Sequence, residues 1–141
     1  CEREWHRRSR IDAISWLMKS DDPLRVLDAA RQFDHLITEM TQRLPRRTPS
    51  GLRAQLSEAA QSISALLAEG FGRQTTAEKI HYSRMANGSV EESQDYLRKC
   101  INERLIDRKA FFKLWNLSVV VGRMILSLIA HYERSPERKP T

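Results

Sequence analysis

Residues 70–78 read Gly-Phe-Gly-Arg-Gln-Thr-Thr-Ala-Glu and separate two long stretches in which apolar residues recur at helical spacing. Gly70 and Gly72 are typical of the end of a helix. Thr75, followed three residues later by Glu78, predicts a capping box, in which each side chain satisfies a free backbone N–H at the start of the next helix. Because the connection is short, we expect these two helices to be antiparallel neighbours.

Helix-capping residues and prolines divide the rest of the chain in the same way. All five prolines fall where a helix can start or has already ended. Asp22-Pro23 predicts the start of a first helix that ends before Pro45, and Thr48-Pro49 repeats that signal for a second helix. Asp107 is the expected cap of a last helix that runs to about Arg134. Alternating strand patterns are absent, so we predict an all-α fold, an antiparallel up-down-up-down four-helix bundle.

The chain of 141 residues has the length of one domain. We expect the bundle to occupy residues 22–134. Residues 1–21 form an extension that is either weakly amphipathic or disordered, and residues 135–141 form a charged tail that we expect to fray. The helix that follows the capping box should turn small and apolar residues to the core; these are Tyr82, Met85, Ala86, Ser89, Tyr96, Leu97, Cys100 and Ile101.

The most apolar segment is 114–130, with Arg123 near its centre. A central Arg disfavours a membrane span, so we interpret this segment as a helix of a soluble bundle. It is apolar around most of its circumference, which leaves two alternatives: a central place in the monomer, or an interface between subunits, which we favour. Gly88 and Gly122 interrupt helices, and we expect close helix approach to compensate for that cost.

The chain carries 24 Lys and Arg against 18 Asp and Glu, a net charge of +6, which favours a polyanionic partner. Its two cysteines are far apart and have no metal-ligand spacing. The first residues include neither an initiator Met nor the apolar run of a secretory signal. We therefore expect a cytoplasmic protein.

Basic residues concentrate in two segments that an antiparallel bundle brings to the same end. Segments 43–53 and 98–113 hold ten basic residues and two acidic ones, an excess of eight positive charges in a chain whose net charge is +6. We call this group the basic pole and predict that it binds nucleic acid; its members are Arg43, Arg46, Arg47, Arg53, Arg98, Lys99, Arg104, Arg108, Lys109 and Lys113.

The alternative interpretation is that cations at helix carboxyl ends merely complement the helix dipole. That does not account for Arg53, Arg108 and Lys109, which we expect near helix amino ends. Phosphate contacts of this kind give affinity that falls with salt and no sequence-specific readout. Aromatic residues lie close by at 111, 112 and 115, but the sequence does not interleave them as a stacking platform, and they could belong to the core.

Signatures of catalysis and metal binding are missing. The four histidines are scattered, and no Cys-x-x-Cys, His-Glu-x-x-His or Glu-x-x-His pattern occurs, so we expect no metal, no cofactor and no enzymatic activity. Gly70-Phe71-Gly72-Arg73 resembles a phosphate loop, but it follows a helix and lacks the Gly-Lys-Ser/Thr ending. A helix cap followed by a tight turn is the better interpretation.

The run Ser-Ile-Ser-Ala-Leu-Leu-Ala-Glu-Gly-Phe-Gly-Arg at 62–73, with Ala-Asn-Gly-Ser-Val-Glu at 86–91, resembles the ribosomal-protein-like family encoded in 23S rRNA intervening sequences. The resemblance spans about 23–133 and departs from the usual pattern at Ser64, Leu66 and Asn87, where Pro, Asn and Arg are common. It implies an up-down bundle that assembles as a homopentamer. It also implies a likeness to the accessory variability proteins of diversity-generating retroelements, which bind nucleic acid and a reverse transcriptase.

Two hypotheses of function follow. The first is a non-enzymatic, oligomeric accessory protein that binds RNA or DNA through phosphate contacts of the basic pole. The second is a scaffold that docks an acidic protein partner, such as a reverse transcriptase or a phage protein, without touching nucleic acid.

Overall fold

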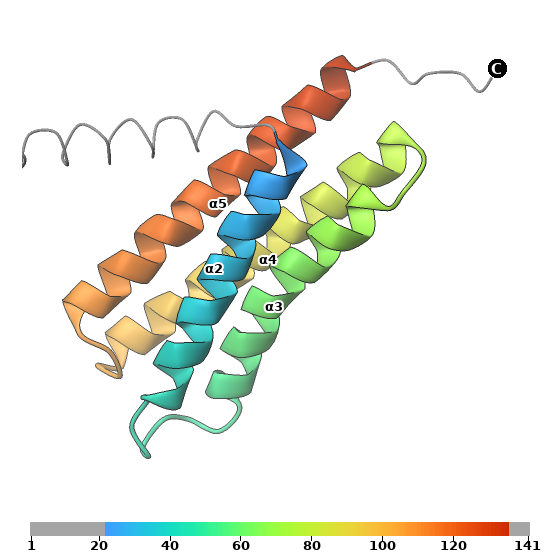
Figure 1. Cartoon of the computed structure of the whole chain (residues 1–141). Helices are drawn as coiled ribbons and strands as arrows, with labels where there is room; N and C mark the ends of the chain where they lie inside the picture. The colour runs from blue at the N-terminus through green and yellow to red at the C-terminus, as the bar shows by residue number, and fades with distance from the viewer. Residues whose placement is uncertain (1–21, 136–141) are drawn as a thin grey trace, which may run out of the picture.

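The computed structural model describes residues 22–135, which form four helices joined by loops and contain no strand (Figure 1). The helices are α2 (Pro23–Gln42), α3 (Leu52–Phe71), α4 (Thr76–Asn102) and α5 (Arg108–Arg134). The expectations for the extension 1–21 and for residues 136–141 lie outside the described residues. The predicted all-α class is confirmed.

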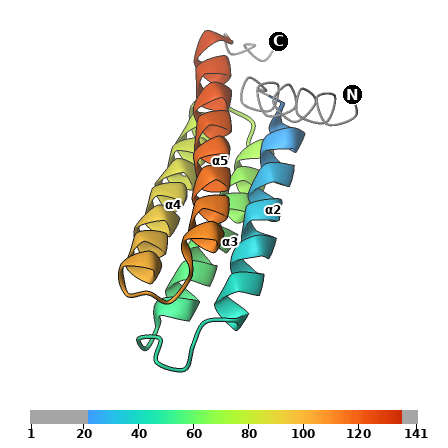
Figure 2. The same ribbon diagram turned by 90° about the vertical axis from the view of Figure 1, so that its left-hand side faces the viewer.

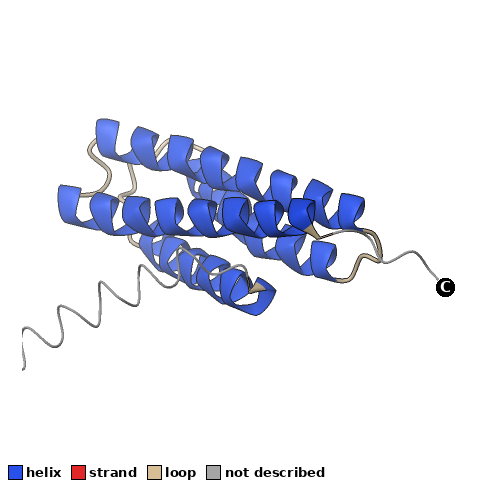
Figure 3. Cartoon of the chain, turned by 90° about the horizontal axis from the view of Figure 1, so that it is seen from above, coloured by secondary structure: helices blue, strands red, loops and turns tan. Residues whose placement is uncertain are grey.

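Consecutive helices run in opposite directions, and each packs against the next, while α5 also packs against α2 and closes the bundle (Figure 2). The view along a perpendicular direction shows the helices side by side along one long axis (Figure 3). The predicted up-down-up-down topology is therefore confirmed. It puts the α2–α3 and α4–α5 connections at one end of the bundle, and the α3–α4 turn with the end of α5 at the other.

Three of the predicted helix starts are confirmed by their caps. The Asp22 carboxylate accepts a 3.0 Å hydrogen bond from the Leu24 N–H, and the Asp107 carboxylate accepts one of 2.7 Å from the Ala110 N–H. The Thr75 hydroxyl accepts from the Glu78 N–H at 3.2 Å, which is one of the two bonds of the predicted capping box, and it donates to the Glu78 carboxylate at 3.1 Å. These bonds satisfy backbone donors that lack a partner inside the helix.

The predicted start at Thr48-Pro49 is wrong. The second helix begins at Leu52, after Gly51 in the left-handed region with a φ of 85°. The Thr48 hydroxyl turns back and donates to the Pro45 carbonyl, so it stabilises the loop and does not cap a helix. Glycine supplies the positive φ at no steric cost, which explains why the chain enters α3 there.

The core lies along the bundle axis and receives one face of each helix. Its largest fully buried side chains come from every helix and include Phe33, Ile37, Leu56, Ile63, Leu67, Leu97, Met124 and Leu128. On α4 the inward face consists largely of small residues, among them the buried Ser83, Ser89 and Ser93. Met85, which we expected in the core, is 43% exposed because it lies on the outer face of α4.

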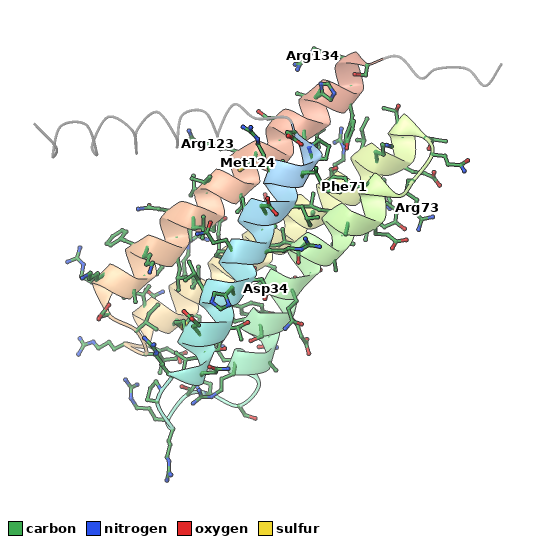
Figure 4. All side chains as sticks on the ribbon, in the orientation of Figure 1. Asp34, Phe71, Arg73, Arg123, Met124 and Arg134 are labelled. Carbon is green, nitrogen blue, oxygen red and sulfur yellow. The ribbon has the colours of Figure 1, made fainter. Side chains whose placement is uncertain are left out.

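Helix α5 is not enclosed by the other three helices. It buries one face, on which Met124 and Ile125 lie, and turns Arg123 away from the bundle (Figure 4). Phe112 and Leu126 remain 47% and 54% exposed. By length and composition α5 could cross a membrane, yet it packs against α2 and α4 here. The alternative of a central place in the monomer is therefore wrong, and the favoured interface between subunits stays a prediction.

Neither mid-helix glycine shows the close helix approach that we expected. A Cβ added at Gly88 would meet nothing within 4 Å, and one at Gly122 would make an ordinary contact of 3.6 Å with Val90. The close approach occurs at Gly70, where a Cβ would lie 2.8 Å from the Tyr82 Cβ. Gly70 thus allows α3 and α4 to come together beside their short turn.

Candidate nucleic-acid interface

The two connections at the lower end of the bundle are tied together by one side chain. Arg47, in the α2–α3 connection, donates hydrogen bonds to the carbonyls of Glu103 at 3.1 Å and Arg104 at 2.6 Å, in the α4–α5 connection. The two basic segments, far apart in sequence, therefore lie side by side (Figure 1). This arrangement gathers the basic pole at one end of the molecule.

Arg53 has a structural task that sequence reasoning missed. Its guanidinium donates to the carbonyls of Thr41 at 2.6 Å and of Leu44 and Pro45 at 2.8 Å each. These carbonyls belong to the end of α2 and the loop after it, where helical partners are lacking. These hydrogen bonds explain why an Arg is present at position 53. The prediction that no local structural role accounts for Arg53 is therefore wrong.

Arg104, in contrast to Arg53, occupies a position where the local backbone conformation disfavours its side chain. It follows the end of α4 with a φ of 57°, and among the described non-glycine residues it alone has a positive φ. Leu105 N–H donates to the Cys100 carbonyl at 2.9 Å and Arg104 N–H to the Ile101 carbonyl at 3.1 Å, which is the Schellman pattern. Glycine is the usual residue at this position, and Arg carries a backbone cost there.

The remaining members of the basic pole divide by their contacts. Arg98 forms a 2.9 Å ion pair with Asp95 and lies over the Trp115 ring, 4.7 Å from its centroid. Arg108 lies 5.9 Å from the Phe112 centroid. Six exposed side chains make no hydrogen bond or ion pair with another residue in the range 22–135; these are Arg43, Arg46, Lys99, Arg104, Lys109 and Lys113.

A groove runs beside the pole between the end of α2 and the start of α5. Its volume is about 370 Å³, its walls include Leu36, Met40 and Leu114, and Arg43 and Lys113 stand among its lining residues. Glu39 and Asp107 also line it, so the groove carries both signs of charge. It therefore brings Arg43 and Lys113 together without adding to the net positive potential.

The three aromatic residues near the pole differ in burial: Phe111 and Trp115 are half-buried, with Phe111 packed against the core, whereas Phe112 is exposed. Phe111 stacks on Trp115 with ring centroids 5.6 Å apart and an angle of 25° between the planes. Phe111 also meets Phe112 edge to face at 5.3 Å. The interpretation that these rings belong to the core is wrong for Phe112, which is the most exposed of the three.

The glycine turn at the opposite end has a structural role. Arg73 Nη2 donates to the Glu69 carboxylate at 2.6 Å and to the Tyr82 hydroxyl at 2.8 Å. Figure 4 shows Arg73 next to the turn between α3 and α4. Glu69 is thus paired within its own turn, and the interpretation of this segment as a helix cap with a tight turn is confirmed.

Potential metal ligands do not gather in the described part of the chain: no group of three or more His, Cys, Asp or Glu side chains there could hold a metal ion. The buried side-chain nitrogen and oxygen atoms of residues 22–135 all have hydrogen-bond partners.

The molecule is an up-down four-helix-bundle protein with a basic end. This class is defined by its topology, its helix lengths and the α3–α4 turn that Arg73 holds through Glu69 and Tyr82. The chain belongs to the 23S rRNA-intervening sequence protein family, whose model matches residues 22–127. The fold is similar to the crystal structure of a protein of unknown function from the S23 ribosomal protein family of Bacteroides thetaiotaomicron VPI-5482. The two share 22% identity over 74% of this chain and 97% of that chain, with a TM-score of 0.70. The comparison with curated proteins gave no match.

Proposed function

We propose that the protein is a non-enzymatic accessory protein that binds nucleic acid through phosphate contacts of the basic pole. The observation that carries the proposal is the pair of hydrogen bonds from Arg47 to the α4–α5 connection, because these bonds bring the two basic segments together. Exposed Arg and Lys side chains on one end of a protein attract phosphates without reading bases.

The side chains that contact phosphate in this proposal are those that make no hydrogen bond or ion pair within residues 22–135. Arg53 is committed to three carbonyls and Arg47 to two, so both shape the pole and contribute less to direct contact. Arg46 and Lys109 are exposed and unpaired within residues 22–135, one from each connection. An Arg at position 104 supports the same view, because it keeps a cation where the backbone favours glycine.

We also propose that the protein assembles as a homo-oligomer, with the homopentamer as the specific expectation. The exposed apolar side chains of α5 support this proposal, since Leu126 lies on a helix face that the monomer leaves uncovered. Assembly around a common axis would place several basic poles on one particle and raise the local positive potential.

Charge reversal tests the nucleic-acid contact. The double variant Arg46→Glu and Lys109→Glu should weaken binding of structured RNA and duplex DNA at least about tenfold at low salt, measured by fluorescence anisotropy. The slope of log affinity against log salt should also become shallower by about two, one unit for each cation that no longer pairs with a phosphate.

The matched control is Arg31→Glu with Arg134→Glu, which changes the charge by the same amount away from the pole. Both residues are exposed; Arg31 lies in the first half of α2, and Arg134 lies about 40 Å along α5 from Arg108. This control should leave affinity and slope nearly unchanged. Equal losses in both double variants would reject the pole as the contact site.

Absence of binding at low ionic strength would favour the alternative, a scaffold that docks an acidic protein partner such as a reverse transcriptase. Salt-insensitive binding would likewise argue against phosphate contacts.

A further inference from the structure

We propose that the cluster formed by Phe111, Phe112 and Trp115 with Arg98 and Arg108 is a stacking site for unpaired bases of RNA. This inference rests on the proposed function, and it names the part of the nucleic acid that the protein selects. It depends on contacts that the sequence alone does not reveal.

Three aromatic rings lie in contact with one another at the start of α5. Phe111 and Trp115 stack, and Phe112 meets Phe111 edge to face, so the three rings form one continuous aromatic surface at the start of α5. Phe112 is 47% exposed, which leaves part of its ring open to solvent. A flat, rigid ring that is partly exposed offers a base the same contact that another ring would offer.

Cations lie beside these rings. Arg108 and Lys109 precede Phe112 by four and three residues, so both lie on the same side of the helix as its ring. The Arg108 guanidinium is 5.9 Å from the Phe112 centroid, and the Arg98 guanidinium is 4.7 Å from the Trp115 centroid. A base on Phe112 would therefore have cations beside its own phosphate.

Arg98 is held in place over the Trp115 ring. Its guanidinium is held by Asp95 at 2.9 Å while it covers the Trp115 ring. Trp115 is half-buried and partly covered, so Phe112 is the ring that can accept a base, and Trp115 supports it through Phe111. The arrangement is preorganised, since ring contacts between neighbours fix the surface before a ligand arrives.

The chemistry of the partner favours RNA over DNA. The basic pole suits the backbone of a duplex, whereas the aromatic surface next to it suits a base that has left the stack. RNA stem-loops present both features side by side, because their loops and bulges expose unpaired bases next to paired stems. Double-stranded DNA offers the backbone but keeps its bases paired.

The experiment compares two RNA probes with the full-length chain. One is a hairpin whose unpaired loop contains 2-aminopurine, and the other is a blunt duplex with the same stem sequence. Phe112→Leu, which keeps an apolar side chain of similar size, should weaken hairpin binding about tenfold and duplex binding less than twofold. Phe112→Trp should restore hairpin affinity and the quenching of 2-aminopurine that stacking produces.

Leu24→Ala is the matched control, because Leu24 is also exposed and apolar but lies at the start of α2, at the end of the bundle opposite to the start of α5. It should change neither probe's affinity. Equal weakening of hairpin and duplex by Phe112→Leu, or no weakening of either, would overturn the stacking site. Tighter binding of the corresponding DNA hairpin than of the RNA hairpin would overturn the assignment to RNA.

The result also separates this inference from the function on which it rests. If Arg46→Glu with Lys109→Glu abolishes binding of both probes while Phe112→Leu has no effect, the stacking site is rejected and the phosphate contact stands. If Phe112→Leu alters only the sedimentation of the protein, the aromatic surface is a contact between copies and the stacking site is rejected. If neither probe binds at low salt, the proposed function is rejected as well.

Discussion

The Arg53 guanidinium, in the first turn of α3, donates a 2.6 Å hydrogen bond to the carbonyl of Thr41 in the last turn of α2. Two further bonds to the loop carbonyls of Leu44 and Pro45 make it the cap of the helix that precedes it. A planar fork with several donors is needed to reach three carbonyls at once, and an ammonium group does not replace it.

Arg53→Lys should therefore lower the free energy of unfolding by about 1–3 kcal/mol, because carbonyls that are partly buried lose their donors. Urea denaturation followed by circular dichroism measures the change. Arg46→Lys is the control, since Arg46 is exposed and makes no such bond, and it should stay within about 0.5 kcal/mol of the parent. Similar values for both variants would contradict the capping role.

Gly70→Ala should destabilise the bundle, because the new Cβ would lie 2.8 Å from the Tyr82 Cβ and would push α3 and α4 apart. Overpacking of this kind costs about 1–3 kcal/mol. Gly88→Ala is the opposite case: nothing lies within 4 Å, and the better helix propensity of Ala should stabilise the protein by up to about 1 kcal/mol. Thermal unfolding of the two variants should give shifts of opposite sign.

Arg104→Gly should separate stability from binding. Glycine relieves the backbone cost of a φ of 57°, so the free energy of unfolding should rise by about 1 kcal/mol, while the loss of a cation weakens RNA binding at low salt. Arg104→Ala removes the same charge but keeps a Cβ, so it should weaken binding equally without the gain in stability. A gain in stability with Ala would argue against strain at this position.

The pKa of the Cys100 thiol is raised to about 11, first by burial and then by the negative charge of Glu103. The unfolded chain therefore loses the thiol proton near pH 9, before the folded chain does. The contribution of this thiol to stability is fully present below pH 9 and is lost as the pH rises towards 11.

Between pH 9 and 11 the free energy of unfolding of the parent should thus fall by about 2–3 kcal/mol more than that of Cys100→Ala, in which the titrating group is absent. The Cys100 thiol of the folded protein should also react with iodoacetamide more slowly at pH 8 than the Cys100 thiol of the unfolded chain. If the free energies of unfolding of the parent and of Cys100→Ala changed in parallel with pH, the raised pKa of Cys100 would be contradicted.

Leu126→Asp should break the proposed homo-oligomer, because it puts a charge on the exposed apolar face of α5. Sedimentation velocity at micromolar concentration should show a smaller species than the parent, with unchanged helix content. Leu24→Asp, at an exposed residue at the start of α2, should sediment like the parent. A parent that sediments as a monomer would refute the oligomer itself.

Helix number, order and most boundaries were predictable from the sequence, because caps and apolar spacing act over a few residues. Asp22, Thr75 and Asp107 cap the helices that their positions predicted. Thr48 misled the prediction, since a Thr before Pro favours both a cap and a loop turn, and Gly51 decided between them. The composition of the basic pole was also predictable, because antiparallel topology follows from short connections.

Only the tertiary structure decided what each cation does. Arg53 and Arg46 look alike in sequence, yet one caps α2 and the other is exposed without a partner among residues 22–135. The left-handed backbone at Arg104 and the stacking of Phe111 on Trp115 also left no signal, because no glycine marks the first and no spacing rule predicts the second. Local energetics act between residues close in sequence, whereas side-chain partners depend on which helices and loops the closed bundle places within hydrogen-bond reach.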